Sequence, residues 1–407
     1  MRSETQSAQD AGGIVGPDVV AACALSSIPG VGATALARIT ALFDGFSGGL
    51  EAGPSGILKR AAELQLRRDA LEFLAKKPDL EELGLAAVAA AKAAGARVLV
   101  LGDPWYSPLL RAIENPPPVL YVRGSLQPET PRIALVGSRD SDDYGLELAR
   151  DLAEGLALAG VQVVSGGARG IDAVAHAGAL WGQGTTVAVL GCGIDIVYPP
   201  ENAALFERLA AGGGAVISEF PPGTGPLRQN FPRRNRTLSG LSSATVVIRA
   251  TRESGSLITA NHAAAQGRPI FAVPGKSHEP LSEGPNQLLT LNAARAVTSA
   301  KDILSALGWP IPEELNGPDP STPRKRKKSP PSPPSPATAQ TIGEEILLDD
   351  EHVKLFNLLD ERTPQHLDDL SVKAQVPVHK ALVKLSELEL KGLAVQRPGK
   401  YFLKRHA

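Results

Sequence analysis

The sequence predicts an α/β protein with a doubly wound parallel sheet at its centre and a smaller helical module on each side. Two observations support this class. Seven short, mainly β-branched and nearly all apolar runs lie between residues 97 and 273, and helix-length amphipathic stretches separate them. Strands that are apolar throughout and joined by helical crossovers are typical of a parallel sheet covered on both faces.

The predicted strands begin at residues 97, 132, 161, 186, 215, 245 and 269 and read RVLVL, RIALVG, VQVVS, TVAVL, AVISE, TVVIR and PIFAV. Between the second and third lies YGLELARDLAEGLALAG. There Leu146, Ala149, Leu152, Ala153 and Leu156 fall on one face of a helix. This alternation predicts a Rossmann-like domain over residues 86–310.

Upstream of this domain, residues 18–85 are rich in Ala and Leu and predict a helical domain, preceded by a disordered N-terminus over 1–17. Its segment Ser27–Gly32 reads SIPGVG and precedes apolar residues at helical spacing, which is typical of a helix-hairpin-helix. The turn of such a hairpin contacts a DNA phosphate through backbone amides, without reading bases. Few arginines lie nearby, so a structural or interaction role is equally open.

Downstream, residues 311–343 predict a solvated linker, because a segment rich in Pro and Ser cannot bury enough apolar surface to offset its ordering entropy. The linker contains five consecutive bases, Arg324 to Lys328. Such a charge run is usually only solvated, and contact with nucleic acid is the less favoured alternative.

Residues 344–407 predict a winged-helix domain, since three helical patterns precede two short strands around Pro398-Gly399. His379, Lys380 and Lys384 are candidates to face duplex DNA, and acidic residues on the same helix (Glu387 and Glu389) weaken that interpretation. Duplex binding and protein docking both stay open for this domain.

Composition excludes several classes of protein. The chain has 407 residues, 43% of them hydrophobic, which excludes a wholly disordered chain. No apolar run reaches the roughly 18 residues of a membrane span, and MRSETQSAQDAGG is no secretory signal. The two cysteines are far apart, which argues against disulfides or zinc and suits a cytoplasmic protein. We find no P-loop, no acyl nucleophile and no metal-ligand spacing, and predict no catalytic residue, metal or cofactor.

Three glycine-rich loops follow predicted strands: Gly137-Ser138-Arg139, the segment Ser165 to Gly170, and Gly191-Cys192-Gly193. Ligands of an open parallel sheet bind outside the carboxyl ends of the strands, so these loops should converge at one edge. Glycine lets backbone amides approach an anion closely, and two of the loops also carry an arginine. Tight strand-to-helix turns are the alternative explanation, and the arginines favour phosphate binding.

The distribution of charge indicates which anion is bound. Forty-two basic residues balance 43 acidic ones overall, but the segment from Gly225 to Lys276 holds eight bases and one acid, Glu253. Within it, Phe231 lies among the arginines of LRQNFPRRNR. Arginine donates bidentate hydrogen bonds to phosphate, and an aromatic face stacks on an unpaired base. The pattern therefore favours single-stranded nucleic acid.

Other polar residues have simpler explanations. We interpret His176 as a packed, hydrogen-bonded helix residue, Asp172 as the cap at the start of that helix, and Cys192 as inert packing. Glu219 is placed to hold a basic loop through a salt bridge. None of them forms an acid/base pair.

Seven motifs in order resemble those of the DNA-processing protein A (DprA/Smf) family. They are VGSR…YG at 136–145, SGGARGIDAVAH at 165–176, TVAVLGCGIDIVYPPEN at 186–202, ISEFPPGTGP at 217–226, NFPRRNRTLSGLS at 230–242, SGSLITA at 254–260 and AVPG at 272–275. The resemblance spans residues 101–307. It also implies that the N-terminal domain is SAM-like and the C-terminal domain a winged helix.

The resemblance implies a non-enzymatic protein of natural transformation that binds and protects incoming single-stranded DNA and loads the RecA recombinase onto it. Homodimerisation through the Rossmann-like domain is implied as well, with single-strand-binding protein as a further candidate partner and no membrane. The predicted DNA-binding residues are Gly137, Ser138, Arg139, Ser165, Gly166, Gly167, Arg169, Gly170, Arg228, Asn230, Phe231, Arg233, Arg234, Asn235, Arg236, Ser254, Gly255 and Lys276.

The sequence departs from the family pattern in two places. Arg249 stands where the family often has an acidic residue, and Gly284-Pro285-Asn286 with Asn292-Ala293 replaces a Gly-Ala step. The second departure lies near the expected dimer contact at Leu288 and Leu289. The alternative function is a nucleotide hydrolase of the lysine-decarboxylase-like (LOG) type, but the PGGxGT segment of that family is missing, since the corresponding place reads RESGSLITA.

Overall fold

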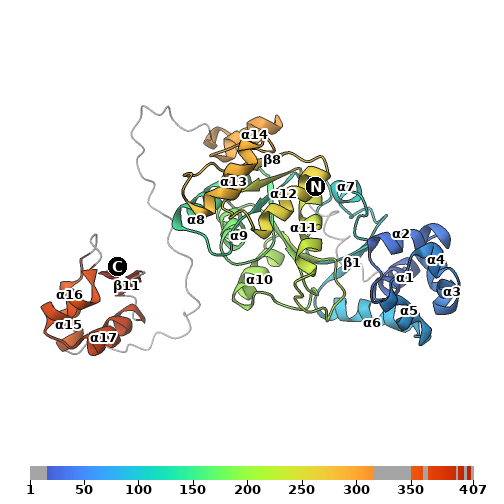
Figure 1. Ribbon diagram of the computed structural model, residues 1–407, viewed down its shortest axis with the longest axis horizontal. Helices are drawn as coiled ribbons and strands as arrows, with labels where there is room; N and C mark the ends of the chain where they lie inside the picture. The colour runs from blue at the N-terminus through green and yellow to red at the C-terminus, as the bar shows by residue number, and fades with distance from the viewer. Residues whose placement is uncertain (1–15, 316–349, 361–364, 391–392, 398–400, 405–407) are drawn as a thin grey trace, which may run out of the picture. The chain divides into compact units, whose positions relative to one another are not determined.

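The computed structural model describes residues 16–315, 350–360, 365–390, 393–397 and 401–404 (Figure 1). It divides into two compact units, residues 1–322 and 323–407. Residues 1–15, the basic run Arg324–Lys328 and the turn at Pro398-Gly399 lie outside the described residues, as do the side chains of His379, Glu387 and Glu389. The predicted domain boundaries stay a prediction.

The first unit is built on one nine-stranded sheet, in the order β1-β2-β6-β5-β4-β3-β7-β8-β9. All neighbours from β6 to β9 pair in parallel, which confirms the α/β class. The seven predicted strands are all present, six of them within this parallel part and the first, β1, outside it. The strands are β1 Arg97–Val100, β2 Val119–Gly124, β3 Arg132–Val136, β4 Gln162–Ser165, β5 Thr186–Leu190, β6 Ala215–Ser218, β7 Ala244–Val247, β8 Ile270–Ala272 and β9 Arg295–Ala296.

The sheet differs from the prediction at one edge, where β2 pairs antiparallel with both β1 and β6. The sequence analysis missed β2 and, at the opposite edge, the two-residue β9, and it placed the first strand in a parallel sheet. The connection from β1 to β2 holds only the four-residue helix α7 (Pro108–Arg111), and a return without a full crossover gives antiparallel neighbours. An apolar strand is compatible with either direction, so its own residues do not decide the pairing.

Helices cover both faces of the sheet (Figure 1). On one face, α8 (Asp143–Leu158), α9 (Ile171–Trp181) and α14 (Ala300–Leu307) share a buried core with side chains of β3, β4, β7 and β8. On the other, α7, α11 (Asn230–Gly240) and α12 (Gly255–Ala265) pack on the alternate residues of the same strands. The predicted face of α8 is confirmed, since Ala149, Leu152, Ala153 and Leu156 are buried and Leu146 packs at the edge of that core.

The N-terminal helices are α1 Pro17–Ser26, α2 Ala33–Leu42, α3 Phe46–Lys59, α4 Ala61–Leu64, α5 Arg68–Ala75 and α6 Leu80–Ala93. Cys23 and Ala91, from α1 and α6, join a buried cluster with Tyr121 of the sheet. The turn between α1 and α2 has Gly30 at φ 75°, and a Cβ built there would lie 3.4 Å from the Asp69 Cβ. The hairpin turn therefore packs against the start of α5, which favours a structural role for it.

The first unit also contains the 3-10 turn η1 (Pro200–Asn202), helix α10 (Ala203–Ala211) and helix α13 (Pro280–Thr290). A second 3-10 turn, η2, covers Glu313–Leu315. Phe206 and Leu209 of α10 join the buried cluster that α1 and α6 form with the sheet.

The second unit has the predicted winged-helix elements: α15 Asp350–Leu358, α16 Leu367–Ala374, α17 Val378–Leu390 and a three-stranded sheet. The order of this sheet is β10 (Gln365–His366), β12 (Tyr401–Lys404) and β11 (Ala394–Arg397). Leu355, Leu370, Leu385 and Phe402 form its core. The side chain of Lys380 is exposed and that of Lys384 is half-buried.

Candidate nucleic-acid interface

The candidate site lies at the carboxyl edge of the large sheet. The chain leaves β3 toward β4 on one side, while β7 lies beside β3 on the other side and is reached from β6 through α11. The strand order therefore reverses between β3 and β7, and such a switch point opens a crevice outside the strand ends. Two adjoining cavities of about 260 Å³ and 600 Å³ occupy this edge. We call them together the trough.

The structure brings most of the predicted residues into the trough. The three glycine-rich loops converge there with the first turns of α11 and α12, as expected from a parallel sheet. The predicted residues that line it are Gly137, Ser138, Arg139, Gly166, Arg169, Arg228, Phe231, Arg234, Asn235, Ser254 and Gly255. Their convergence is a finding, and their contact with DNA stays a prediction.

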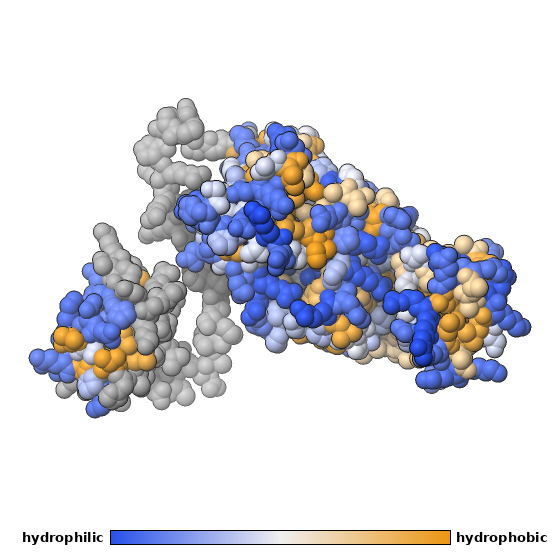
Figure 2. All heavy atoms as spheres, viewed as in Figure 1, coloured by the Kyte–Doolittle hydropathy of each residue, from blue (hydrophilic) through white to orange (hydrophobic). Residues whose placement is uncertain are grey.

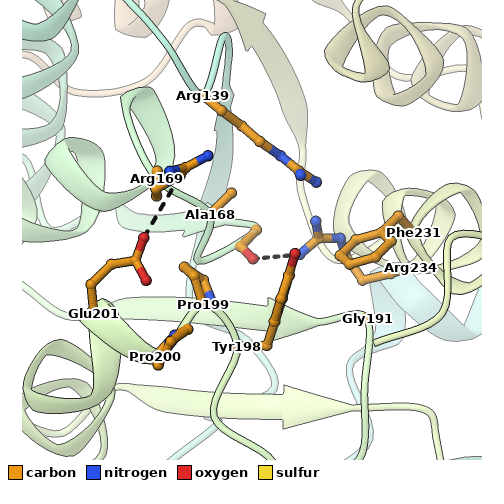
Figure 3. Close-up of a pocket in the computed structure, with 11 residues that line it drawn as sticks. Arg139, Ala168, Arg169, Gly191, Tyr198, Pro199, Pro200, Glu201, Phe231 and Arg234 are labelled. Atoms are coloured by element: carbon orange, nitrogen blue, oxygen red, sulfur yellow. Dashed lines mark hydrogen bonds and ion pairs between the residues drawn. The ribbon is translucent and has the colours of Figure 1, made fainter. Parts of the chain in front are cut away.

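Phe231 lines both cavities of the trough. In the smaller cavity its ring lies beside Arg234 (Figure 3). The Arg139 guanidinium is 5.3 Å from the centre of its ring and the Arg234 guanidinium 5.7 Å. Gly191 makes this position possible, because a Cβ at residue 191 would lie only 2.9 Å from the ring. The ring of Tyr198 faces Phe231 at 5.9 Å between centroids. The trough thus combines two aromatic rings with two cations.

Arg139 and Arg228 are the cations of the trough that are open to a ligand. Both side chains are exposed, and neither forms an ion pair with a carboxylate in the part of the chain that the structure describes. Arg169 is also exposed, and its Nε lies 3.7 Å from an oxygen of Glu201. An exposed pair at this distance is weak, so Arg169 can turn to an anion at little cost.

Arg234 is in the trough but buried beneath its surface, with 5% of the residue exposed. Its Nη1 donates to the carbonyls of Gly166 and Val189, at the ends of β4 and β5. Burial lowers the pKa of Arg234, and the nearby Asp172 carboxylate opposes that shift. Arg234 therefore braces two strand ends while it places a positive charge under Phe231.

Two amides of the second glycine loop donate to a carboxylate of the protein itself. The Asp172 carboxylate accepts from the Gly166 amide at 3.1 Å and from the Ala168 amide at 3.4 Å. Asp172 does not cap α9 as predicted, since Gly170 is the residue before the helix and Asp172 reaches back to the loop. Burial raises the pKa of Asp172, and Arg234 opposes that shift. Two amides of this loop, those of Gly166 and Ala168, thus donate to the protein's own carboxylate, and phosphate binding by the loop stays a prediction.

Four further loop and helix residues support the trough from below. The Ser165 hydroxyl is buried and donates to the Leu135 carbonyl at 2.7 Å. Gly167 and Gly170 adopt positive φ values of 65° and 70°, which fits the turn explanation for these glycines. The Asn230 side chain donates to the Gly225 carbonyl at 3.4 Å.

Three predicted basic residues point elsewhere. Arg233 pairs with the buried Glu219 at 2.9 Å, which is the salt bridge expected of Glu219. Arg236 donates to the Glu114 carbonyl at 3.0 Å and so holds the loop after α7. Lys276 lies in a separate cavity of about 520 Å³ and pairs with Glu279 at 3.1 Å.

Arg249, the departure from the family pattern, is buried in the wall of this separate cavity. It pairs with Asp142, the cap of α8, and with Glu279 at 2.9 Å. Hydrogen bonds from Arg249 lower the pKa of Asp142 and of Glu279, to which Lys276 also donates. The two carboxylates neutralise the cations of this part of the edge.

Two residues of the trough were missed by the sequence analysis. Tyr198 and Glu201 follow β5 in the VYPPEN segment and reach into the smaller cavity (Figure 3). The segment was visible as a motif, but the long loop gave no indication that it returns to the strand ends. Asn202 fixes this return, because its side chain donates to the Gly167 carbonyl at 2.9 Å and to the Ala168 carbonyl at 3.2 Å.

His176 is packed and hydrogen-bonded, as expected. Its Nδ1 lies 2.7 Å from the Thr186 hydroxyl, and burial lowers the pKa of the ring to about 3. Cys192 is buried as well. Leu288 packs at the margin of the core and Leu289 is half-buried, and their role in dimerisation stays a prediction.

Within the described ranges, no group of three or more His, Cys, Asp and Glu side chains is placed to hold a metal ion. Over the same ranges, none of the helices has both the length and the apolar character that a bilayer span requires.

The sequence was compared with protein families and with known relatives. Residues 97–308 match the family model described as DNA recombination-mediator protein A, and residues 328–400 match the DprA winged helix domain. Protein Smf of Escherichia coli is 39% identical over 304 residues, which cover 74% of this chain and 76% of that protein. The DNA processing protein DprA of Bacillus subtilis is 36% identical over 262 residues, or 63% and 88% of the two chains.

A solved structure agrees with these sequence matches. The X-ray structure of DNA processing protein A from Streptococcus pneumoniae superposes with a TM-score of 0.60 and 29% identity, covering 71% of this chain and 97% of that one. Sequence and fold therefore agree, and the chain belongs to the DprA/Smf family of DNA processing proteins.

Proposed function

We propose that this protein binds single-stranded DNA in the trough and delivers it to the RecA recombinase without catalysing a reaction. The observation that carries the proposal is a group of three residues that lines both cavities, in which Phe231 has the guanidinium groups of Arg139 and Arg234 within 5.7 Å of its ring centre. A stacking ring beside cations fits a strand whose bases are unpaired.

The size and openness of the trough support a polymer as its ligand. The larger cavity is about 600 Å³ and is lined by residues from β3 to the first turn of α12, among them the exposed Arg228. Polar strand ends and helix N-termini suit a phosphate backbone, which binds by charge and hydrogen bonding rather than by sequence. The proposal does not need the Gly166 amide, because exposed guanidinium groups supply the phosphate contacts.

Two buried acid/base groups beside the trough, His176 and Asp172, are engaged within the protein, which supports binding without catalysis. His176 has a pKa lowered to about 3 and its ring nitrogen faces Thr186 inside the protein. Asp172 is engaged by loop amides. A hydrolase of the LOG type would release free base from nucleoside monophosphates, and we expect chromatography of such a reaction to find no free base.

RecA, single-strand-binding protein and a second copy of this chain are the proposed partners. The match of residues 97–308 to DNA recombination-mediator protein A supports a role in passing DNA to a recombinase. We propose the homodimer through the sheet domain, near Leu288 and Leu289, and leave duplex DNA or a protein as the ligand of the winged helix.

The DNA-binding part of the proposal is tested by fluorescence anisotropy with a labelled oligonucleotide at several salt concentrations. Replacing Arg228 with Ala should weaken binding. It should also reduce the slope of log affinity against log salt concentration by about one, because a protein that neutralises one phosphate fewer releases fewer counterions when it binds. Replacing Phe231 with Leu should weaken binding by about fivefold and leave the salt slope unchanged, because the ring contributes stacking and no charge. Unchanged affinity in both variants would reject the trough as the DNA site.

The RecA part needs its own measurement. We expect the wild-type protein to accelerate RecA assembly on an oligonucleotide coated with single-strand-binding protein. The ATP hydrolysis rate of RecA measures this assembly. The Arg228→Ala variant should do so less at the same concentration. If both proteins accelerate RecA assembly equally, RecA loading does not depend on DNA binding in the trough.

A further inference from the structure

The loop between β6 and α11 carries Arg228 to the larger cavity of the trough, and little of this loop is buried. From Gly223 to Gln229 every residue is exposed or half-buried, and Leu227 is 52% exposed. Figure 2 shows hydrophilic side chains over much of the face of the first unit that Figure 1 presents, with hydrophobic groups in small areas between them. Since apolar packing contributes little to this loop, hydrogen bonds have to set the position of Arg228.

The third glycine-rich loop and Asp195, which both follow β5, make these hydrogen bonds. The Gly193 amide donates to the Thr224 carbonyl at 2.7 Å. The Asp195 carboxylate accepts from the Gly223 amide, and both of its oxygens lie 2.9 Å from that nitrogen. The segment after β5 is therefore bonded at two successive residues to the loop that carries Arg228.

Gly193 is required for this contact, because the two segments approach too closely for a side chain. A Cβ built at Gly193 would lie 2.5 Å from Oδ1 of Asp195 and 2.9 Å from the Pro221 carbonyl oxygen. The Thr224 hydroxyl donates to the same Pro221 carbonyl at 2.6 Å and closes the turn. Arg228 lies between this anchor and the start of α11, which is the second fixed point of the loop.

Asp195 is an exposed carboxylate close to the place that we propose for a polyanion. The segment that contains it continues to Tyr198, which lines the smaller cavity. A negative charge here repels phosphate and reduces affinity. The hydrogen bond to the Gly223 amide is therefore the contribution of Asp195 that favours binding, and it acts through the position of the loop.

We propose that Asp195 is a positioning residue for DNA binding, whose carboxylate fixes the loop so that Arg228 is in place before the strand arrives. The inference rests on the proposed single-strand function and adds to it a residue that does not line the trough. A loop that is already ordered loses less conformational entropy when the ligand binds, and this raises affinity. Asp195 itself makes no contact with the DNA.

Two substitutions at Asp195 separate its hydrogen bond from its charge. Asp195→Ala removes both and should weaken binding to a labelled oligo(dT) by about fivefold, since the loop then has to be ordered on binding. Asp195→Asn keeps an acceptor oxygen for the Gly223 amide and removes only the charge, so it should bind at least as tightly as the wild-type protein. A residue that acted only through repulsion would give tighter binding in both variants.

A double-mutant cycle measures the dependence on Arg228. Asp195→Ala should lower affinity in the wild-type background and change it by less than about twofold in the Arg228→Ala background, because the loop then has no guanidinium to place. Gly193→Ala, whose methyl group forces the same two segments apart, should show the same dependence.

Asp79→Ala is the matched control. Asp79 is also an exposed aspartate, and it accepts from the Glu82 amide at 3.0 Å at the start of α6. This variant should keep wild-type affinity in both backgrounds. Hydrogen exchange of residues 219–229, measured without DNA, should be faster in Asp195→Ala and unchanged in Asp195→Asn. Unfolding curves show that each variant is folded.

Unchanged or tighter binding by Asp195→Ala, an equal loss in Asp195→Asn, or a loss that persists in the Arg228→Ala background would overturn the positioning role while leaving single-strand binding intact. Equal hydrogen exchange in Asp195→Ala and the wild-type protein would overturn it as well. If Arg228→Ala alone binds the oligonucleotide as tightly as the wild-type protein, the proposed DNA contact of Arg228 fails, and this inference fails with it.

Discussion

Two arginines at the same edge of the sheet have opposite surroundings. Arg139 follows β3, is exposed and lies beside the ring of Phe231. Arg249 follows the neighbouring strand β7, is buried and pairs with Asp142 and Glu279. The edge is therefore divided into an open half, around Arg139, and a neutralised half, around Arg249. The placement of carboxylates, more than the number of arginines, decides which half is available to a polyanion.

Burial explains why the two halves differ. A charge taken out of water is costly unless it is paired and hydrogen-bonded, so Arg249 has to be surrounded by acceptors. Asp142 also caps α8, accepting from the Gly145 amide at 2.9 Å, and so links the start of that helix to the end of β7. Arg139 stays hydrated and has no such requirement. Arg249 in the neutralised half therefore connects α8, β7 and Glu279, and we propose the open half as the place of the ligand.

The largest effect on DNA binding is expected in the open half. Arg139→Glu should weaken single-strand affinity by about a hundredfold at low salt, because a like charge then faces the phosphates. The salt slope should fall as well. Anisotropy titrations at two salt concentrations measure both quantities. Wild-type affinity in this variant would show that the open half does not bind the DNA.

A matched change in the neutralised half should affect stability instead. Arg249→Met leaves Asp142 and Glu279 without their buried partner and should destabilise the protein by about 2 kcal/mol in urea unfolding. At a temperature where the variant is folded, we expect its DNA affinity to be within about twofold of the wild-type value. If Arg249→Met keeps the wild-type stability and loses most of its DNA affinity, the neutralised half binds the DNA and its structural assignment is wrong.

The neutralised half should also respond to acid. The pKa values of Asp142 and Glu279 are lowered in the folded protein, mainly by hydrogen bonds from Arg249. Their contribution to stability is therefore complete above the pKa values of the unfolded chain and is lost as the pH falls through the lowered folded values. Stability should decline with acidification in the wild-type protein and decline less in Arg249→Met. Parallel declines in the two proteins would contradict this source of pH dependence.

The smallest effect is expected at Lys276. The residue belongs to the neutralised half, where it pairs with Glu279 at 3.1 Å outside the trough. Lys276→Ala should change single-strand affinity by less than about twofold, since a paired and exposed charge contributes little. A loss as large as that of Arg139→Glu would show that the DNA crosses both halves.

Much of the fold was predictable because its determinants are local or follow from topology. Apolar runs predicted the seven strands. The rule that parallel strands end at one edge predicted that Gly137, Gly166 and Gly191 lie at one site, and all three line the trough. The direction of β1 and β2 was not predictable, since it depends on a connection of 18 residues with only a short helix.

The details of the site depended on which way side chains turn. A run of arginines in sequence does not show that Arg233 meets Glu219 while Arg234 turns inward to the ends of β4 and β5. A glycine-rich loop likewise does not show that Asp172 fills its amides. Tyr198 and Glu201 came from a loop whose return to the strand ends depends on Asn202. These are contacts between distant segments, which pattern and spacing leave undetermined.

The central claim, that the open half of this edge holds unpaired DNA, is tested most directly by competing single-stranded against duplex oligonucleotides for the wild-type protein and Arg139→Glu at two salt concentrations. We predict that the single strand displaces the duplex from the wild-type protein, that its advantage is lost in Arg139→Glu, and that binding weakens as salt rises. Equal competition by the duplex, or a single-strand preference that survives in Arg139→Glu, would contradict the account.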